Sequence, residues 1–201
     1  MPRRAVLSDE QRMALLALPD DETTLVQHWT LSEDDLAIIV RRRRPHNRLG
    51  FAIQLCALRY PGRLLRPGEL IPDTPLAFVA EQLQIAPEVL ADYATRGPTR
   101  YEQLDALREG FGFTQFSRPL RAALQEWLLP IALTTTSGAG LARSLLGECR
   151  RRRIIVPGIS SVERMVAQAL LGAERHVAEH LTRGLETGQR RLLDALLLPH
   201  A

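Results

Sequence analysis

Apolar residues recur every three or four positions along most of the chain, which is the spacing that places them on one face of an α-helix. The helices predicted from this pattern cover residues 8–18, 20–29, 32–44, 46–60, 99–110, 117–131, 141–152, 160–181 and 187–197, and two more begin at residues 74 and 87. Residues 154–156 have the composition of a short strand, but Pro157 and Gly158 follow at once and no partner strand is evident. We therefore expect an all-α fold with short connections.

Residues that cap helices stand at several of the predicted starts. Three helices begin with Ser or Thr followed three residues later by Glu or Gln, the spacing of a capping box: Ser8–Gln11, Thr99–Glu102 and Ser160–Glu163. Ser32 is followed by three acidic residues, which the positive end of the helix dipole favours. The predicted helix boundaries therefore rest on local chemistry as well as on periodicity.

A stretch rich in Pro and Gly, residues 61–75, interrupts the helical pattern, and we interpret it as an ordered connector between two helical lobes. The expected division is a helix-turn-helix-like lobe over 1–66, a second helical lobe over 73–157, and a C-terminal helical pair over 158–201. The last helix ends in several leucines, as if it led to a downstream region that this sequence does not include.

Charge changes this picture more than length does. The 201 residues carry 26 basic and 23 acidic side chains, every basic one is arginine, and the net charge of +3 excludes a histone-like polycation. Eight arginines fall in two runs of four, Arg41–Arg44 and Arg150–Arg153. Codon bias explains arginine in place of lysine, but it does not explain the runs, which point to a phosphate backbone.

The sequence shows no signal for export or for a membrane. Cys56 and Cys149 lie far apart and outside any metal-binding spacing, and the longest apolar run, Trp127 to Leu133, is far shorter than a membrane span. The N-terminus lacks the apolar stretch of a secretory signal. We expect a cytoplasmic protein without a membrane partner.

One motif is typical of enzymes. His176, Glu179 and His180 have the H-x-x-E-H order of a zinc site on one helical face, but no third ligand is evident, and a solvated face is the simpler interpretation. No phosphate-binding loop, nucleophile elbow or Cys-His pair is present. We therefore expect no catalytic residue, no metal and no cofactor in this chain.

The first arginine run joins two predicted helices in the layout of a helix-turn-helix. Arg41, Arg42, Arg43 and Arg44 precede His46, Asn47 and Arg48, and asparagine and arginine are the side chains that read adenine and guanine edges. The second of these helices is largely apolar, with a narrow polar stripe of Asn47, Gly50 and Gln54. It is equally well interpreted as the core helix of its lobe, with the arginines on its rim.

Two further clusters are candidates for DNA contact. Gln115, Arg118, Arg121 and Gln125 lie on one side of the helix that starts at Ser117, although ordinary capping and solvation explain them as well. Arg150, Arg151, Arg152 and Arg153 end another helix and spread around its circumference, which suits phosphate contact better than base reading.

Several segments resemble the N-terminal region of the Tn-three family of replicative transposases, a DNA-binding part with a domain of the DUF4158 type. The segments are residues 46–55 (HNRLGFAIQL), 58–63, 99–102, 107–108 and 152–158 (RRIIVPG), together with 31–35 and 189–192. They span almost the whole chain, in matching order and spacing.

The resemblance implies a DNA-binding region that recognises the terminal inverted repeats of a transposon during DNA transposition. The expected partners are double-stranded DNA, the rest of the transposase polypeptide and a second copy of the chain. The metal-dependent Asp-Asp-Glu site of the family has no counterpart here, so the chain itself is not expected to be an enzyme. The alternative is a helical interaction or dimerisation module without direct DNA contact, favoured by the apolar last helix and the near balance of acids and bases.

Overall fold

The computed structural model describes residues 6–93 and 97–196, with the backbone alone for residues 97–100. The described parts are helical apart from short connections, which confirms the predicted all-α fold. The helices are α1 (Asp9–Leu15), α2 (Glu22–Trp29), α3 (Glu33–Ile39), α4 (Pro45–Arg59), α5 (Asp73–Leu83), the 3-10 helix η1 (Pro87–Asp92), α6 (Gly97–Phe111), α7 (Arg118–Ala132), α8 (Gly138–Arg151), α9 (Ile159–Thr182) and α10 (Thr187–Leu196).

Two of the predicted helix starts form as expected from the sequence. The Ser8 hydroxyl accepts a hydrogen bond from the backbone N–H of Gln11, and the Gln11 side chain accepts one from the backbone N–H of Ser8. Ser32 makes the same reciprocal pair with Asp35 at the start of α3. In both cases the cap is satisfied within four residues of the chain, so neighbouring sequence is enough to predict it.

The capping boxes predicted at Thr99 and Ser160 are wrong. Helix α6 begins at Gly97, two residues before Thr99, and Pro98 fits the first turn because proline needs no hydrogen-bond partner there. Helix α9 begins after Gly158, so Ser160 lies within its first turn. Its expected partner Glu163 instead pairs with Arg12 of α1 at 2.7 Å, a tertiary contact that local spacing does not show.

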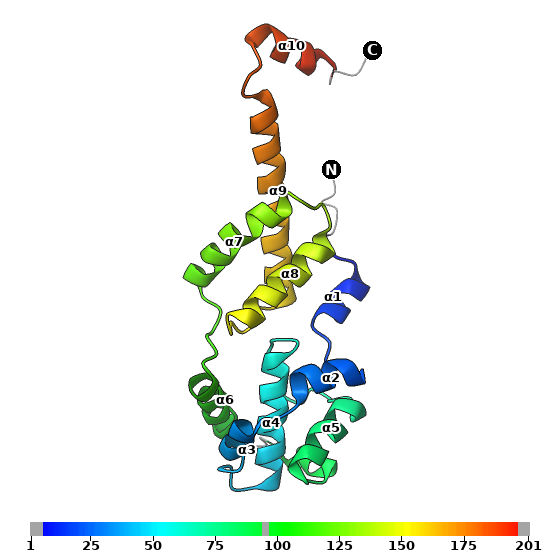
Figure 1. Cartoon of the computed structure of the whole chain (residues 1–201), viewed down its shortest axis with the longest axis vertical. Helices are drawn as coiled ribbons and strands as arrows, with labels where there is room; N and C mark the ends of the chain where they lie inside the picture. The colour runs from blue at the N-terminus through cyan, green and yellow to red at the C-terminus, as the bar shows by residue number, and fades with distance from the viewer. Residues whose placement is uncertain (1–5, 94–96, 197–201) are drawn as a thin grey trace.

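Buried side chains form two clusters, each around one helix. The α4 cluster contains the buried residues of α2 to α6 with Leu31, Leu65 and Ile155. The α9 cluster contains those of α7, α8 and α9 with Leu7, Ile154 and Val156. Figure 1 shows α4 among α2, α3, α5 and α6 in one half of the molecule, and α7 and α8 beside α9 in the other.

A short extended segment, Ile154–Val156, runs between the two clusters. Its side chains alternate, so that Ile154 and Val156 enter the α9 cluster while Ile155 enters the α4 cluster. Its backbone pairs with Thr114 in a single parallel bridge and with Gly62 through a 2.8 Å hydrogen bond from Val156. No partner for this segment was evident from the sequence, because both partners are distant in the chain.

The three-part division of the chain stays a prediction, because packing clusters do not show which segments fold alone. Within the described residues, the connector of residues 61–75 packs on the α4 cluster through Leu64, Leu65 and Ile71. Helices α5 and α6 belong to that same cluster.

Candidate nucleic-acid interface

The first arginine run forms an exposed corner between α3 and α4, residues 40–48, which we call the α3–α4 corner. Arg41, Arg43 and Arg44 are exposed, and none of them makes an ion pair within residues 6–93 and 97–196. Helix α4 begins at Pro45 without a side-chain cap and without an acidic residue in its first turn. The positive end of this 15-residue helix is therefore surrounded by uncompensated positive charge.

Backbone donors at the corner are also unused. Among the described residues, the N–H groups of Arg43, Arg44 and His46 make no hydrogen bond. Donors at a helix N-terminus, together with arginine side chains, form the arrangement that binds phosphate oxygens. His46 and Asn47 are half-buried in the first turn of α4, beside these donors.

The remaining two arginines of the corner are already engaged. The Nε–H of Arg48 donates a 2.7 Å hydrogen bond to the backbone carbonyl of Arg42. The guanidinium carbon of Arg42 lies 4.4 Å from the centroid of the Phe51 ring, a cation–π contact with a fully buried residue. These two contacts attach the loop to the first two turns of α4.

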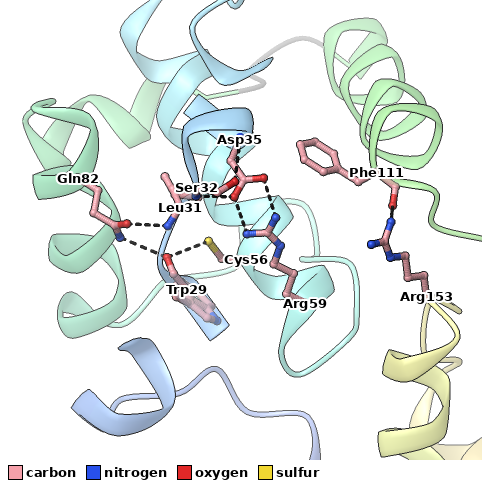
Figure 2. Close-up of polar contacts among 9 residues, drawn as sticks. All are labelled: Trp29, Leu31, Ser32, Asp35, Cys56, Arg59, Gln82, Phe111 and Arg153. Carbon is pink, nitrogen blue, oxygen red and sulfur yellow. Dashed lines mark hydrogen bonds and ion pairs between the residues drawn. The ribbon is translucent and has the colours of Figure 1, made fainter. Parts of the chain in front are cut away.

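Helix α3 is held in place by a buried ion pair, shown in Figure 2. Arg59 donates two hydrogen bonds to the Asp35 carboxylate, at 2.7 and 2.9 Å, from the far end of α4. Burial works to raise the pKa of Asp35, but the hydrogen bonds from Arg59 and from the backbone of Ser32 outweigh it and hold that pKa below its usual value. Asp35 therefore stays charged and fixes α3 against α4.

Beyond Asn47, the polar stripe of α4 does not face solvent or a groove. Residues 49–58 are all buried, and η1 packs across this part of α4. A side chain at Gly50 would overlap the Tyr93 ring, and Gln54 is 1% exposed. Of the two interpretations left open by the sequence, α4 is the core helix, and only its first turn is available to a partner.

At the start of α7, the candidate residues differ in availability. Gln115 and Arg118 are exposed, while Arg121 donates a 3.2 Å hydrogen bond to Gln168 of α9. Gln125 donates at 3.0 Å to the Met165 carbonyl and is half-buried between the two helices. The outer end of this surface is available to a partner, whereas its inner end serves the packing of α7 on α9.

The second arginine run is engaged inside the molecule. Arg150 donates a 3.3 Å hydrogen bond to the Pro61 carbonyl and lies 4.9 Å from the Tyr60 ring centroid, and burial lowers its pKa. Arg153, whose φ is 52°, donates at 2.9 Å to the Phe111 carbonyl (Figure 2). Both residues thus connect α8 to the α4 cluster.

Glu148 pairs with both arginines in the middle of that run. Its carboxylate is 5% exposed and accepts hydrogen bonds of 2.6 to 2.7 Å from Arg151 and Arg152. The Arg151 hydrogen bond, opposed by burial and assisted by Arg152, lowers the pKa of Glu148 to about 2. Glu148 was not among the residues expected from the sequence, although its spacing of three and four residues before two arginines is the signal of helical ion pairs.

The two arginine runs lie at opposite ends of α4. Arg44 precedes its first residue, whereas Arg150 contacts Tyr60 and Pro61 just beyond its last. Fifteen residues at about 1.5 Å each separate the two runs by roughly 22 Å along the helix. The runs therefore belong to different environments: within the described residues Arg41, Arg43 and Arg44 make no ion pair, whereas the guanidinium groups of the second run are engaged by other groups of the protein, even at the exposed Arg151 and Arg153.

The H-x-x-E-H motif lies on an exposed part of α9. His176, Glu179 and His180 are all exposed, and the described residues contain no group of three side chains that could hold a metal ion. In the same residues, no helix has the length and apolar character needed to cross a bilayer.

Comparison with known proteins identifies the family that this chain matches. Residues 6–169 match the family described as "Domain of unknown function (DUF4158)". The chain is 42% identical over 197 residues to the transposase for transposon Tn21 of Escherichia coli, and 38% identical over 197 residues to that for transposon Tn501 of Pseudomonas aeruginosa. It is 32% identical over 194 residues to the transposase for transposon Tn1546 of Enterococcus faecium.

These alignments cover 96 to 98% of this chain and 20% of each relative, so the chain spans about one fifth of the length of these transposases. The matched family region includes the α3–α4 corner, both arginine runs and the joint between the clusters. The resemblance noted from the sequence is thereby confirmed, and the chain belongs to the DUF4158 family.

Proposed function

We propose that this chain is the N-terminal DNA-binding region of a transposase and that it recognises the terminal inverted repeats of its transposon. The α3–α4 corner is its principal contact, with Arg41, Arg43 and Arg44 on phosphates and Asn47 near base edges. The observation that carries the proposal is the set of exposed, unpaired arginines around an uncapped helix N-terminus.

The start of α7 supports a second contact surface. Arg118 and Arg121 occupy its first turn, where no acidic residue is present and where the helix dipole disfavours positive charge. The dipole therefore gives no reason for Arg118, whereas a bound phosphate does; Arg121 already donates to Gln168 at the inner edge of this surface. The proposal leaves Arg150 to Arg153 out of the DNA contact, because their guanidinium groups are engaged within the protein.

Fluorescence anisotropy over a series of salt concentrations tests the principal contact. The probes are the inverted-repeat duplex and a scrambled duplex of the same length and composition. We expect tighter binding to the inverted repeat, and a triple variant, Arg41→Gln with Arg43→Gln and Arg44→Gln, should lower the slope of log K against log salt by up to about 0.9 per lost phosphate contact.

The matched control removes three exposed arginines elsewhere: Arg175→Gln on α9, Arg183→Gln just after its end, and Arg191→Gln on α10. This control loses the same charge, so the slope should stay close to that of the wild type. Equal affinity for both duplexes would contradict specific recognition. A wild-type slope in the Arg41, Arg43 and Arg44 variant would show that the corner does not contact DNA.

A second candidate function is a protein interaction module, favoured by apolar side chains on the projecting end of the molecule. Leu181, Leu192 and Leu196 are 69 to 75% exposed on α9 and α10. Figure 1 shows this end extending away from both clusters. Light scattering over a range of concentrations tests this function. A stable dimer that binds neither duplex would favour it, provided that the double substitution Leu192→Gln with Leu196→Gln converts the dimer to a monomer.

A further inference from the structure

From the sequence, Arg48 is a candidate DNA contact, yet its position in the structure fits a different role. Its side chain is half-buried, and its Nε–H points to the Arg42 carbonyl at 2.7 Å, six residues back in the chain. This hydrogen bond joins the first turn of α4 to the middle of the loop between α3 and α4, and so closes the loop. The loop itself has two backbone bonds to α3, from Val40 to the Leu36 carbonyl at 2.9 Å and from Arg42 to the Ile39 carbonyl at 3.0 Å.

The residue that Arg48 holds is itself held at its other end. The Arg42 guanidinium rests on Phe51, which lies one turn after Arg48 on α4 and is fully buried. The backbone carbonyl and the side chain of Arg42 are therefore both attached to α4. With Arg42 fixed in the middle of the run, Arg41, Arg43 and Arg44 are the members left exposed.

From this geometry we propose that Arg48 is a positioning residue, which fixes the α3–α4 corner through the Arg42 carbonyl and so holds Arg41, Arg43 and Arg44 ready for phosphate oxygens. This inference rests on the proposed function for its DNA part only. The loop closure that it describes exists in the free protein and is measurable there.

Limited trypsin digestion of the free protein measures loop closure without DNA. Trypsin cleaves after arginine, so Arg41, Arg42 and Arg43 report opening of the loop, whereas the bond from Arg44 to Pro45 resists cleavage. Arg48→Lys keeps the charge but places a carbon where Nε stood, and Arg48→Gln removes the charge. Both variants should be cut in the loop about fivefold faster, the factor expected for one lost hydrogen bond.

Anisotropy with the inverted-repeat duplex gives the second readout. For a positioning residue, Arg48→Lys and Arg48→Gln weaken binding alike, by about fivefold. Neither change has an effect in the background that already lacks Arg41, Arg43 and Arg44. The control is Arg143→Lys and Arg143→Gln on the exposed side of α8, which should change neither readout.

Three results overturn the proposal. The first is wild-type trypsin rates in the loop of both Arg48 variants. The second is cleavage that rises throughout the chain with loss of the helical circular dichroism signal, which makes Arg48 a residue of global stability. The third is wild-type affinity in Arg48→Lys with a slope lowered by about 0.9 in Arg48→Gln, which makes Arg48 a direct phosphate contact. If the wild type fails to bind DNA, faster loop cleavage in both variants still supports the positioning role while the proposed function fails.

Discussion

The guanidinium groups of this chain are used in two different ways, and a carboxylate partner separates them. Arg59 and Arg151 place planar forks against buried carboxylates, a geometry that a lysine ammonium does not reproduce. Arg41, Arg43 and Arg44 keep theirs in solvent. The same residue type therefore serves internal structure at one end of α4 and remains available for a partner at the other.

Glu148 carries a prediction at the residue scale, because its carboxylate is the common partner of two arginines. The pKa of Glu148 is lowered from 4.5 to about 2, so its stabilising effect is present above pH 4.5 and is lost as the pH falls toward 2. Replacing it by Gln should lower the free energy of unfolding by about 1–3 kcal/mol at neutral pH.

Urea unfolding at a series of pH values measures this effect. The difference between the wild type and Glu148→Gln should shrink as the pH falls from 4.5 toward 2. Glu126→Gln, on the exposed side of α7, serves as the control and should follow the wild type. A difference that stays constant across this range would show that the charge of Glu148 does not stabilise the fold.

Single elements of this protein follow local sequence where their partners are local. Ser8 and Ser32 cap α1 and α3 through residues three positions away, and both were predictable. The start of α9 was not, since Glu163 is drawn to Arg12 by packing between α1 and the α9 cluster. The burial of α4 was left open by its sequence, because an apolar helix with a polar stripe fits either a core or a groove.

Gly62 tests the segment that joins the two clusters. Its φ is +104°, and a side chain there would lie 3.0 Å from Cγ of Arg150 and from Cγ2 of Val156. Gly62→Ala should therefore combine backbone strain with overlap at the joint and cost about 1–3 kcal/mol of stability, or roughly 2–4 °C in Tm per kcal/mol.

Gly68→Ala is the matched control, since Gly68 also has a positive φ, of +69°, but no atom within 4 Å of its missing side chain. Gly68→Ala introduces backbone strain without overlap, so it should lower Tm by less than Gly62→Ala does. Equal losses in the two variants, measured by thermal unfolding, would mean that the close approach of Arg150 and Val156 adds nothing.

Across the whole molecule, the two clusters meet at a stack of side chains from α2, α4 and α8. The His28 ring lies parallel to that of Tyr60, 4.9 Å between centroids, and the Arg150 guanidinium lies at the same distance from Tyr60. Trp29 donates a 3.0 Å hydrogen bond to the Tyr60 carbonyl. Charge and aromatic contact are thus combined where the halves touch.

His28 makes this contact sensitive to pH. Burial lowers the pKa of His28 below 6.5, and the charge of Arg150 lowers it further. Below pH 6.5 the unfolded chain binds a proton there that the folded protein resists, so stability should fall as the pH drops. His28→Phe keeps an aromatic ring against Tyr60. The drop in Tm from about one pH unit above 6.5 to about one pH unit below it should therefore be smaller in this variant than in the wild type.

The control for this prediction is His176→Phe on the exposed part of α9, which should leave the pH dependence of Tm unchanged. An identical pH dependence in His28→Phe and the wild type would show that His28 does not couple protonation to folding.

The sequence by itself determined the all-α class, most of the helices and the resemblance to transposases, because periodicity, local caps and matching segments are all written in neighbouring residues. It also marked two equal runs of four arginines. Only the tertiary structure decided between them, since Pro61 and Phe111 engage Arg150 and Arg153 and nothing in the described residues pairs with the exposed arginines of the first run. The local pair with Glu148 is written in the sequence, but the contacts of Arg150 and Arg153 join residues far apart in the chain, and such contacts decide which guanidinium groups are left without a partner inside the protein.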